Sequence, residues 1–287
     1  EHMPLIQLRS FTNLSPPLIS HNKNNGSEAP LFCCDSFPPG EAKNSEDFGV
    51  HHSTERSTLR RRANAICSYI HYSTNKEGEC TLIKNIVFDM GGVLIVWDPV
   101  RMLNQLHLSE ADNELLNREL LQNPIWTEAD AGLHTEEQLA QTACDHLPER
   151  LHQSVWALVQ WYKWFLTPMP GMAALVRELK ENGYRIYLLS NAETNLRGYF
   201  PQIPGSECFD ALMVSAEERL MKPSQDIYQR LFQKFDLEPS QCWFTDDNAP
   251  NVEAAIQAGM KAAQFSGDVA LLRRKMREAG IRCKEEL

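Results

Sequence analysis

Short apolar runs alternate with helical patterns from residue 171 to the C-terminus, and this alternation limits the possible folds more than any other feature. The runs are rich in β-branched and aromatic residues and too short for helices, as expected of buried strands, and lie at 185–189, 210–214, 241–245 and 260–265. The stretches between them carry apolar residues at helical spacing and typical capping residues. Strands that alternate with helices form parallel βαβ units, so we predict an α/β fold with a doubly wound parallel sheet.

A further strand is predicted well before these, at Ile86-Val87-Phe88. It ends on Asp89, and Gly91 and Gly92 follow closely. Ligands bind beyond the carboxyl ends of strands in an open parallel sheet, and glycines let the backbone approach a ligand. Asp89 is therefore placed for chemistry.

Polar residues end two of the later strands as well, and a lysine precedes a proline in the loop between them. The complete set is Asp89, Ser190, Asn191, Lys222, Asp246 and Asp247. A carboxylate can attack phosphorus, neighbouring carboxylates recruit Mg²⁺, and a hydroxyl, backbone amides and a lysine bind phosphate oxygens. We predict a phosphate site with a bound Mg²⁺.

The segment 98–167 is predicted to form four helices inserted after the first strand. They begin near Pro99, Ser109, Thr135 and Pro148, which are residue types favoured at helix starts. The segment is rich in tryptophan, which is consistent either with ordinary packing or with an aromatic wall over a substrate. Asp130 is the best candidate for a polar group turned toward that substrate.

Residues 1–81 are rich in Ser, Asn, His and Pro and carry no lasting helical or strand period. We expect them to be disordered or a non-native extension, with the natural protein beginning near Leu82. The mass of the natively expressed protein tests that hypothesis. The predicted organisation is thus 1–81 as an extension, 82–97 and 168–287 as the catalytic core, and 98–167 as an inserted helical cap.

The net charge of −10 over 287 residues argues against nucleic acid and an anionic membrane surface as partners. The eight cysteines lack metal-ligand spacing and are expected to be reduced thiols. Neither a membrane-spanning run nor a signal pattern is evident, so a cytoplasmic location is predicted. The expected partner is a small phosphorylated metabolite, and the oligomeric state stays open.

Four segments resemble, in order, the motifs of the haloacid dehalogenase superfamily of phosphatases: Phe88–Leu94, Leu189–Asn191, Met221–Pro223 and Thr245–Asn248. The resemblance covers about residues 83–280. Within the superfamily the chain is most similar to the α-D-glucose-1-phosphate phosphatase group. That group likewise has glycine two residues after the nucleophile, a helical cap between the first two motifs and an Asp-Asp-Asn fourth motif.

The resemblance implies that Asp89 forms an aspartyl-phosphate and that Lys222 orients it. Ser190 and Lys222 would bind the phosphoryl group, beside Asn191, Gly91 and Gly92. It also implies that Mg²⁺ is held by Asp89, the backbone carbonyl of Gly91 and Asp247, with Asp246 bound directly or through water.

The sequence departs from most phosphatases of this superfamily at Gly91, where they carry a second Asp as general acid and base. General acid–base help is typically worth about 10²–10⁴-fold in rate. We expect a sugar 1-phosphate substrate, because its anomeric leaving group needs less protonation than an ordinary alcohol.

Two other functions are consistent with the same residues. A 2-haloacid dehalogenase also uses an Asp nucleophile without the second Asp, and needs no metal. A regulatory module would keep the phosphate site but lack the second Asp, and would therefore bind phosphate without turnover.

Overall fold

The computed structural model describes residues 82–285, and the structural statements below concern that range. The predictions made for residues 1–81 lie outside it.

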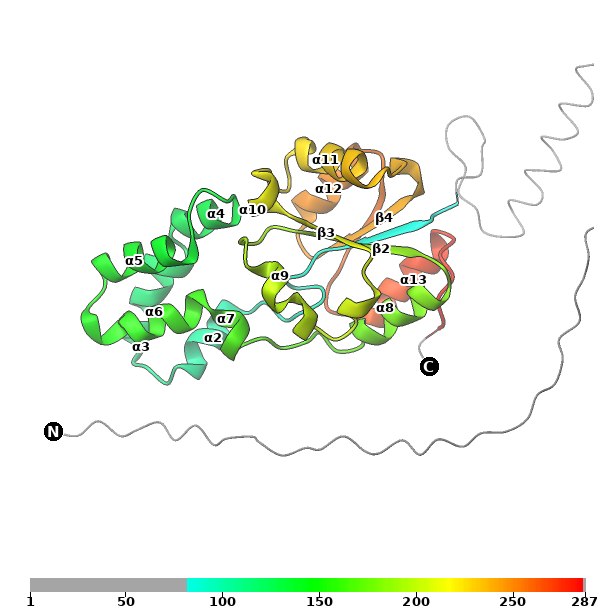
Figure 1. The fold of residues 1–287 in the computed structure, drawn as a ribbon. Coiled ribbons are helices and arrows are strands. Elements are labelled where there is room, and N and C mark those ends of the chain that lie inside the picture. The colour runs from blue at the N-terminus through cyan, green and yellow to red at the C-terminus, as the bar shows by residue number, and fades with distance from the viewer. Residues whose placement is uncertain (1–81, 286–287) are drawn as a thin grey trace, which may run out of the picture. The chain divides into compact units, whose positions relative to one another are not determined.

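Five parallel strands form one sheet in the order β3-β2-β1-β4-β5 (Figure 1). Ile86 of β1 is in register with Ile186 of β2 on one side and Trp243 of β4 on the other. The strands are β1 (Asn85–Phe88), β2 (Arg185–Ser190), β3 (Ala211–Val214), β4 (Cys242–Asp246) and β5 (Lys261–Gln264). The predicted α/β class with a parallel sheet is confirmed.

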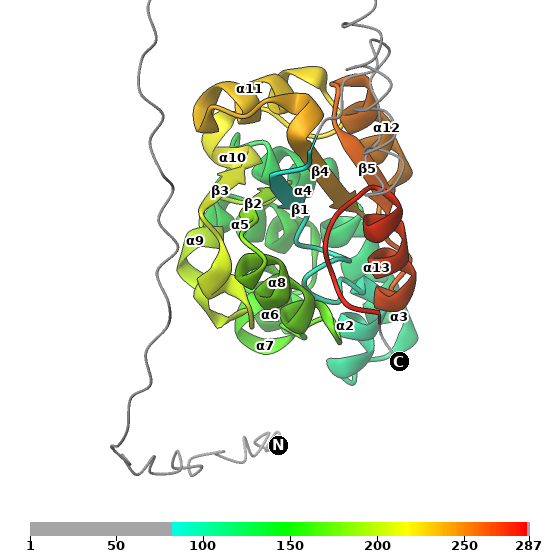
Figure 2. The ribbon, with the colours of Figure 1, turned by 90° about the vertical axis from the view of Figure 1, so that its right-hand side faces the viewer.

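Successive side chains of a strand point to opposite faces of the sheet, so apolar side chains lie on both faces. Helices cover both. Ile86 and Phe88 pack in one buried cluster, with apolar residues of α8 and α13, whereas Val87 packs in another, with residues of α11 and α12. Figure 2 shows the two helix pairs on opposite sides of the strands. Their bounds are α8 (Met172–Glu181), α11 (Gln225–Phe235), α12 (Ala249–Gln257) and α13 (Val269–Glu278).

Several short elements between the strands were not predicted. Three or four residues are too few to show a helical period, which is why the sequence pattern missed them. They are α9 (Leu196–Tyr199), α10 (Ser215–Glu218) and the 3₁₀ turns η3 (Phe200–Gln202), η4 (Ser206–Cys208) and η5 (Pro239–Gln241).

The segment between β1 and α8 is helical, and Figure 1 shows it grouped beyond one end of the strands. Its elements are α2 (Pro99–Gln105), α3 (Glu110–Leu116), the π-helix η1 (Asn117–Leu121), α4 (Pro124–Asp130), α5 (Glu136–His146), the 3₁₀ turn η2 (Glu149–Leu151), α6 (His152–Val159) and α7 (Trp161–Trp164).

The prediction of four helices in this segment was wrong in number. It missed α4, which Asn123 caps by accepting a hydrogen bond from the Ile125 amide at 3.1 Å, with Pro124 as the first helical residue. The last predicted helix is broken at Gln160, whose φ of −96° and ψ of 38° are not helical. The capping box at Thr135 and Gln138 is present.

No helix between residues 82 and 285 has the length and apolar character needed to cross a bilayer. The cysteines of that range, Cys144, Cys208, Cys242 and Cys283, are free thiols.

The fold predicts different costs for two truncations. Leu175 of α8 is 0% exposed, so Leu175→Ala leaves a cavity and should lower the free energy of unfolding by about 2–5 kcal/mol. Ile256 of α12 is 53% exposed, so Ile256→Ala should change it by about 0.5 kcal/mol or less. Denaturant titration measures both, and similar losses would contradict the packing described here.

Candidate active site

The polar residues that end the strands meet at one edge of the sheet. β1 lies between β2 and β4, so the chain leaves it toward one side and returns on the other. Such a switch in strand order opens a crevice at the carboxyl ends of the strands. Asp89 follows β1, and its amide donates to the Thr245 carbonyl of β4 at 2.9 Å, which places it beside Asp246. The structure therefore brings together residues far apart in sequence.

Lys222 joins the carboxyl groups of the two central strands. Its Nζ lies 2.7 Å from Asp89 Oδ1 and 2.6 Å from Asp246 Oδ2, and the residue is only 4% exposed. Asn191 holds the backbone of Lys222 by accepting from its amide at 2.9 Å and donating to its carbonyl at 3.0 Å. The lysine is thereby fixed at both its backbone and its amine.

Burial and the neighbouring charges both shift the pKa values of this group. Burial raises the pKa of Asp89 to about 7, with Lys222 acting in the opposite direction and Asp246 in the same one. For Lys222, burial favours a lower pKa, but the adjacent Asp89 and Asp246 outweigh it and raise the pKa. The site thus holds excess negative charge that an added cation would offset.

The two acids of the Asp246-Asp247 pair differ in their surroundings. Asp246 is completely buried and also accepts from the Asn248 amide at 2.8 Å and from the Asn251 side-chain amide at 3.1 Å. Asp247 is the more exposed of the two, and partial burial of its carboxyl, followed by the charge of Asp246, raises its pKa. Carboxylate oxygens of Asp89, Asp246 and Asp247 all lie within 4.8 Å of one another. This oxygen-rich donor set fits a hard divalent cation such as Mg²⁺.

Glycine is required at residue 92 because the side chain of Asp247 lies close to it. The φ of +70° at Gly92 is in the left-handed region, and a Cβ there would lie 2.3 Å from Asp247 Oδ2. A Cβ at Gly91 would meet only the Trp97 side chain, at ordinary distances of 3.6 Å to its Cβ and 3.8 Å to its Cγ. The second glycine therefore makes room for a carboxylate of the site, whereas the first does not.

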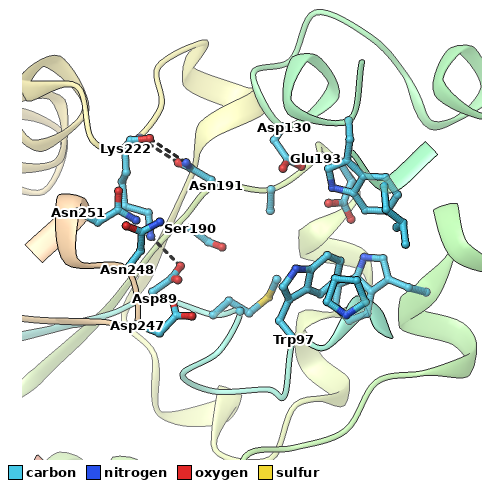
Figure 3. Close-up of a pocket in the computed structure, with 17 residues that line it drawn as sticks. Asp89, Trp97, Asp130, Ser190, Asn191, Glu193, Lys222, Asp247, Asn248 and Asn251 are labelled. Carbon is cyan, nitrogen blue, oxygen red and sulfur yellow. Dashed lines mark hydrogen bonds and ion pairs between the residues drawn. The ribbon is translucent and has the colours of Figure 1, made fainter. Parts of the chain in front are cut away.

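A cavity of about 340 Å³ opens from these residues toward the helical segment (Figure 3). Its near end carries the predicted residues Asp89, Gly91, Ser190, Asn191, Lys222 and Asp247. Its far end carries Asp130 and Glu193 with the indole rings of Trp97, Trp126 and Trp161. Asp130, singled out in the sequence, lines this cavity from the end of α4.

Sequence reasoning missed several residues of the cavity. Asn251 holds Asp246 from the first turn of α12, and its place soon after the strand-end acids was an available signal. Glu193 lies three residues beyond Ser190, where nothing in the pattern marks it. The contribution of Trp97, Trp126 and Trp161 depends on how the helical segment folds against the sheet.

A family model described as haloacid dehalogenase-like hydrolase matches residues 83–259. A sesquiterpene phosphatase of Aspergillus oryzae is 26% identical over 202 residues, covering 67% of this chain and 94% of that protein. A D-ribitol-5-phosphate phosphatase of Bacteroides thetaiotaomicron is 25% identical over 193 residues, covering 64% and 92%.

A solved structure shares the fold. It is a haloacid dehalogenase family enzyme of Bacteroides thetaiotaomicron in complex with magnesium and inorganic phosphate, with a TM-score of 0.52 and 21% identity. The match covers 66% of this chain and 98% of that one.

The geometry of the glycines yields a matched pair of variants. Gly92→Ala should lower the free energy of unfolding by about 1–3 kcal/mol, because alanine is strained at this φ and displaces Asp247. Gly91→Ala meets neither obstacle and should be neutral or slightly stabilising. Denaturant titration distinguishes the two, and equal stability of both variants would contradict the described approach of Asp247.

Proposed function

The chain belongs to the haloacid dehalogenase-like hydrolase family, and from that premise we propose that it is a Mg²⁺-dependent phosphomonoesterase acting on a small sugar phosphate, with sugar 1-phosphates favoured. Its phosphatase relatives support a phosphatase. The observation that carries the proposal is the buried ammonium of Lys222, which holds Asp89 at the near end of a substrate-sized cavity.

Asp89 is the proposed nucleophile. One of its carboxylate oxygens attacks phosphorus, the bond from phosphorus to the leaving oxygen breaks, and an aspartyl-phosphate forms. Water then attacks the phosphorus and the bond from phosphorus to the Asp89 oxygen breaks, which releases inorganic phosphate and regenerates Asp89. The proton that this water loses balances the one that the departed alkoxide takes up from solvent. Lys222 restrains the carboxylate and compensates negative charge, while Ser190, Asn191 and the backbone of Gly91 and Gly92 bind the phosphoryl oxygens.

Mg²⁺ fits the donor set of the site. Asp89, the backbone carbonyl of Gly91 and Asp247 are the proposed ligands. Asp246 instead orients Lys222, since its oxygens already accept from Lys222, Asn248 and Asn251. When bound, the ion supplies positive charge that offsets the repulsion between a carboxylate and a phosphoryl dianion.

The segment 98–167 is proposed to act as a cap over the core formed by 82–97 and 168–287. It lines the cavity with Trp126, Asp130 and Trp161, so that water is excluded during transfer. Gly91 offers no general acid, and a sugar 1-phosphate tolerates this best because its anomeric leaving group is more acidic than an ordinary alcohol.

The geometry weighs against a 2-haloacid dehalogenase. A carboxylate substrate would face the negative charge of Asp247 and Asp89 with no cation added. Lys222 would not offset that charge, because two acids already share it. A phosphate-binding module without turnover keeps the same geometry, and only an assay separates it from an enzyme.

Asp89→Asn should reduce phosphate release from a panel of phosphate monoesters by at least about a thousandfold, because the amide is not a nucleophile. Removing Mg²⁺ with EDTA should abolish release by the unchanged protein. Colorimetric detection of inorganic phosphate measures both effects, with Asp226→Asn, at an exposed position of α11, as the matched control.

Release that persists in EDTA or in Asp89→Asn would contradict the mechanism. If the unchanged protein with Mg²⁺ releases no phosphate, halide release from 2-haloacids would identify the dehalogenase. Phosphate binding without either reaction would identify the binding module.

The missing acid at residue 91 predicts a preference among isomers. The value of kcat/KM should be at least about tenfold higher for glucose 1-phosphate than for glucose 6-phosphate, because the 6-hydroxyl needs protonation as it leaves. Steady-state phosphate release measures the ratio. Faster turnover of the 6-phosphate would show that the absent acid does not select the leaving group.

A further inference from the structure

Two carboxyl groups stand at the far end of the cavity, away from the phosphate site. Asp130 ends α4, and Glu193 follows β2; Figure 3 shows both on the opposite side from Asp89 and Lys222. Glu193 Oε1 is buried and has no hydrogen-bond partner. In the part of the chain that the structure describes, neither side chain forms an ion pair. Both residues are half-buried, and buried polar atoms are normally hydrogen-bonded, so the unpaired Oε1 of Glu193 calls for a donor.

A single buried hydroxyl positions both of the segments that carry these groups. Ser215 is 0% exposed, and its Oγ donates to the Asp130 carbonyl at 2.6 Å and accepts from the Ala192 amide at 2.8 Å. Gly132 packs closely on the same element, since a Cβ there would lie 2.2 Å from the Ala216 carbonyl oxygen. The carboxyl pair is therefore built into the junction between the helical segment and the sheet.

The surroundings of the pair favour neutral, protonated carboxyl groups while no ligand is bound. Burial, followed by the charge of Glu193, raises the pKa of Asp130 well above its usual range. Burial also raises the pKa of Glu193 to about 7, and the nearby Glu136 acts in the same direction. Tyr199 acts on Glu193 in the opposite direction. Among the described residues, no lysine or arginine acts on either group, so a bound cation would lower both pKa values and favour the ionised carboxylates.

Indole rings complete this end of the cavity. The ring centroid of Trp97 lies 5.1 Å from that of Trp161 and 6.0 Å from that of Trp126, and all three residues line the cavity with the carboxyl pair. The face of an indole attracts cations, most strongly where water is excluded. Carboxylates and indoles together are the chemistry that recognises an ammonium group.

We propose that Asp130 and Glu193, with the three tryptophans, bind a protonated amine on the leaving alcohol, so that the substrate is an amino-sugar or amino-alcohol phosphate. This inference rests on the proposed phosphatase function and assigns its substrate class. A neutral polyol would hydrogen-bond to the carboxyl groups in their protonated form. An ammonium group would form hydrogen bonds and also stabilise the ionised form.

Two pairs of substrates that differ in a single group test the proposal. Glucosamine 1-phosphate is compared with glucose 1-phosphate, and phosphoethanolamine with 2-hydroxyethyl phosphate. The protein should prefer the amine in at least one pair by about tenfold or more in kcat/KM, which corresponds to about 1.4 kcal/mol. No preference for the amine in either pair would overturn the proposal and favour a neutral polyol.

Charge-removing variants assign the preference to these residues. In Asp130→Asn and Glu193→Gln, the amine-to-hydroxyl ratio of kcat/KM should fall toward one, whichever way the absolute rates move. Glu137→Gln, at an exposed cap position outside the cavity, should keep the ratio of the unchanged protein. An amine preference that survives in both Asp130→Asn and Glu193→Gln would place its origin elsewhere and overturn the assignment.

A binding measurement separates this inference from the phosphatase function. Titration calorimetry with Asp89→Asn and Mg²⁺ compares the affinities for the same pairs of phosphates without turnover. Tighter binding of the amine that is weakened by a second substitution, Glu193→Gln, supports the amine site even if no phosphate is released. Equal affinity within both pairs contradicts the amine site even where the phosphatase assay succeeds.

Discussion

The site depends on one buried ammonium group held between two carboxylates. Taking an ion out of water costs several kcal/mol, so Lys222 is tolerated at 4% exposure only because Asp89 and Asp246 are both within 2.7 Å. That requirement fixes the relative positions of β1 and β4, which carry the two acids, and of the loop that carries the lysine. The position of the proposed nucleophile Asp89 thus depends on the register of the central strands. It also depends on the hydrogen bonds from Asn191 to the Lys222 backbone.

The two ends of the cavity are supported in different ways. The near end is built from strand termini and the first turn of α12, whose positions the sheet determines. The far end is built from α4, α7 and the segment after β2, which meet through Ser215 and Gly132. Under the proposed function, the rigid end performs the transfer that phosphatases share. The end made by the helical segment selects the alcohol, and small changes in that segment would alter the substrate without disturbing Asp89.

Local patterns made the sheet and the near end predictable. Strand length and apolar composition located all five strands, and the rule that ligands bind at strand carboxyl ends located Asp89, Ser190 and Asp246. What could not be predicted depends on contacts between segments distant in sequence. Glu193 has no motif of its own and becomes part of the cavity only because Ser215 draws its loop toward Asp130. Helix α4 was missed because only Ile125 and the small Ala129 are buried among its seven residues, which is too few to show a helical period.

The absent acid at residue 91 and the carboxyl pair at the far end are connected under the proposed mechanism. Because residue 91 is glycine, no side chain there protonates the leaving oxygen. This removes a contribution typically worth about 10²–10⁴-fold in rate. Binding energy from parts of the substrate remote from phosphorus can offset such a loss by fixing the reacting geometry. A substrate held at the phosphoryl group by Lys222 and at its alcohol by Asp130 and Glu193 has little freedom to leave the in-line arrangement. Recognition of the alcohol then serves catalysis as well as specificity.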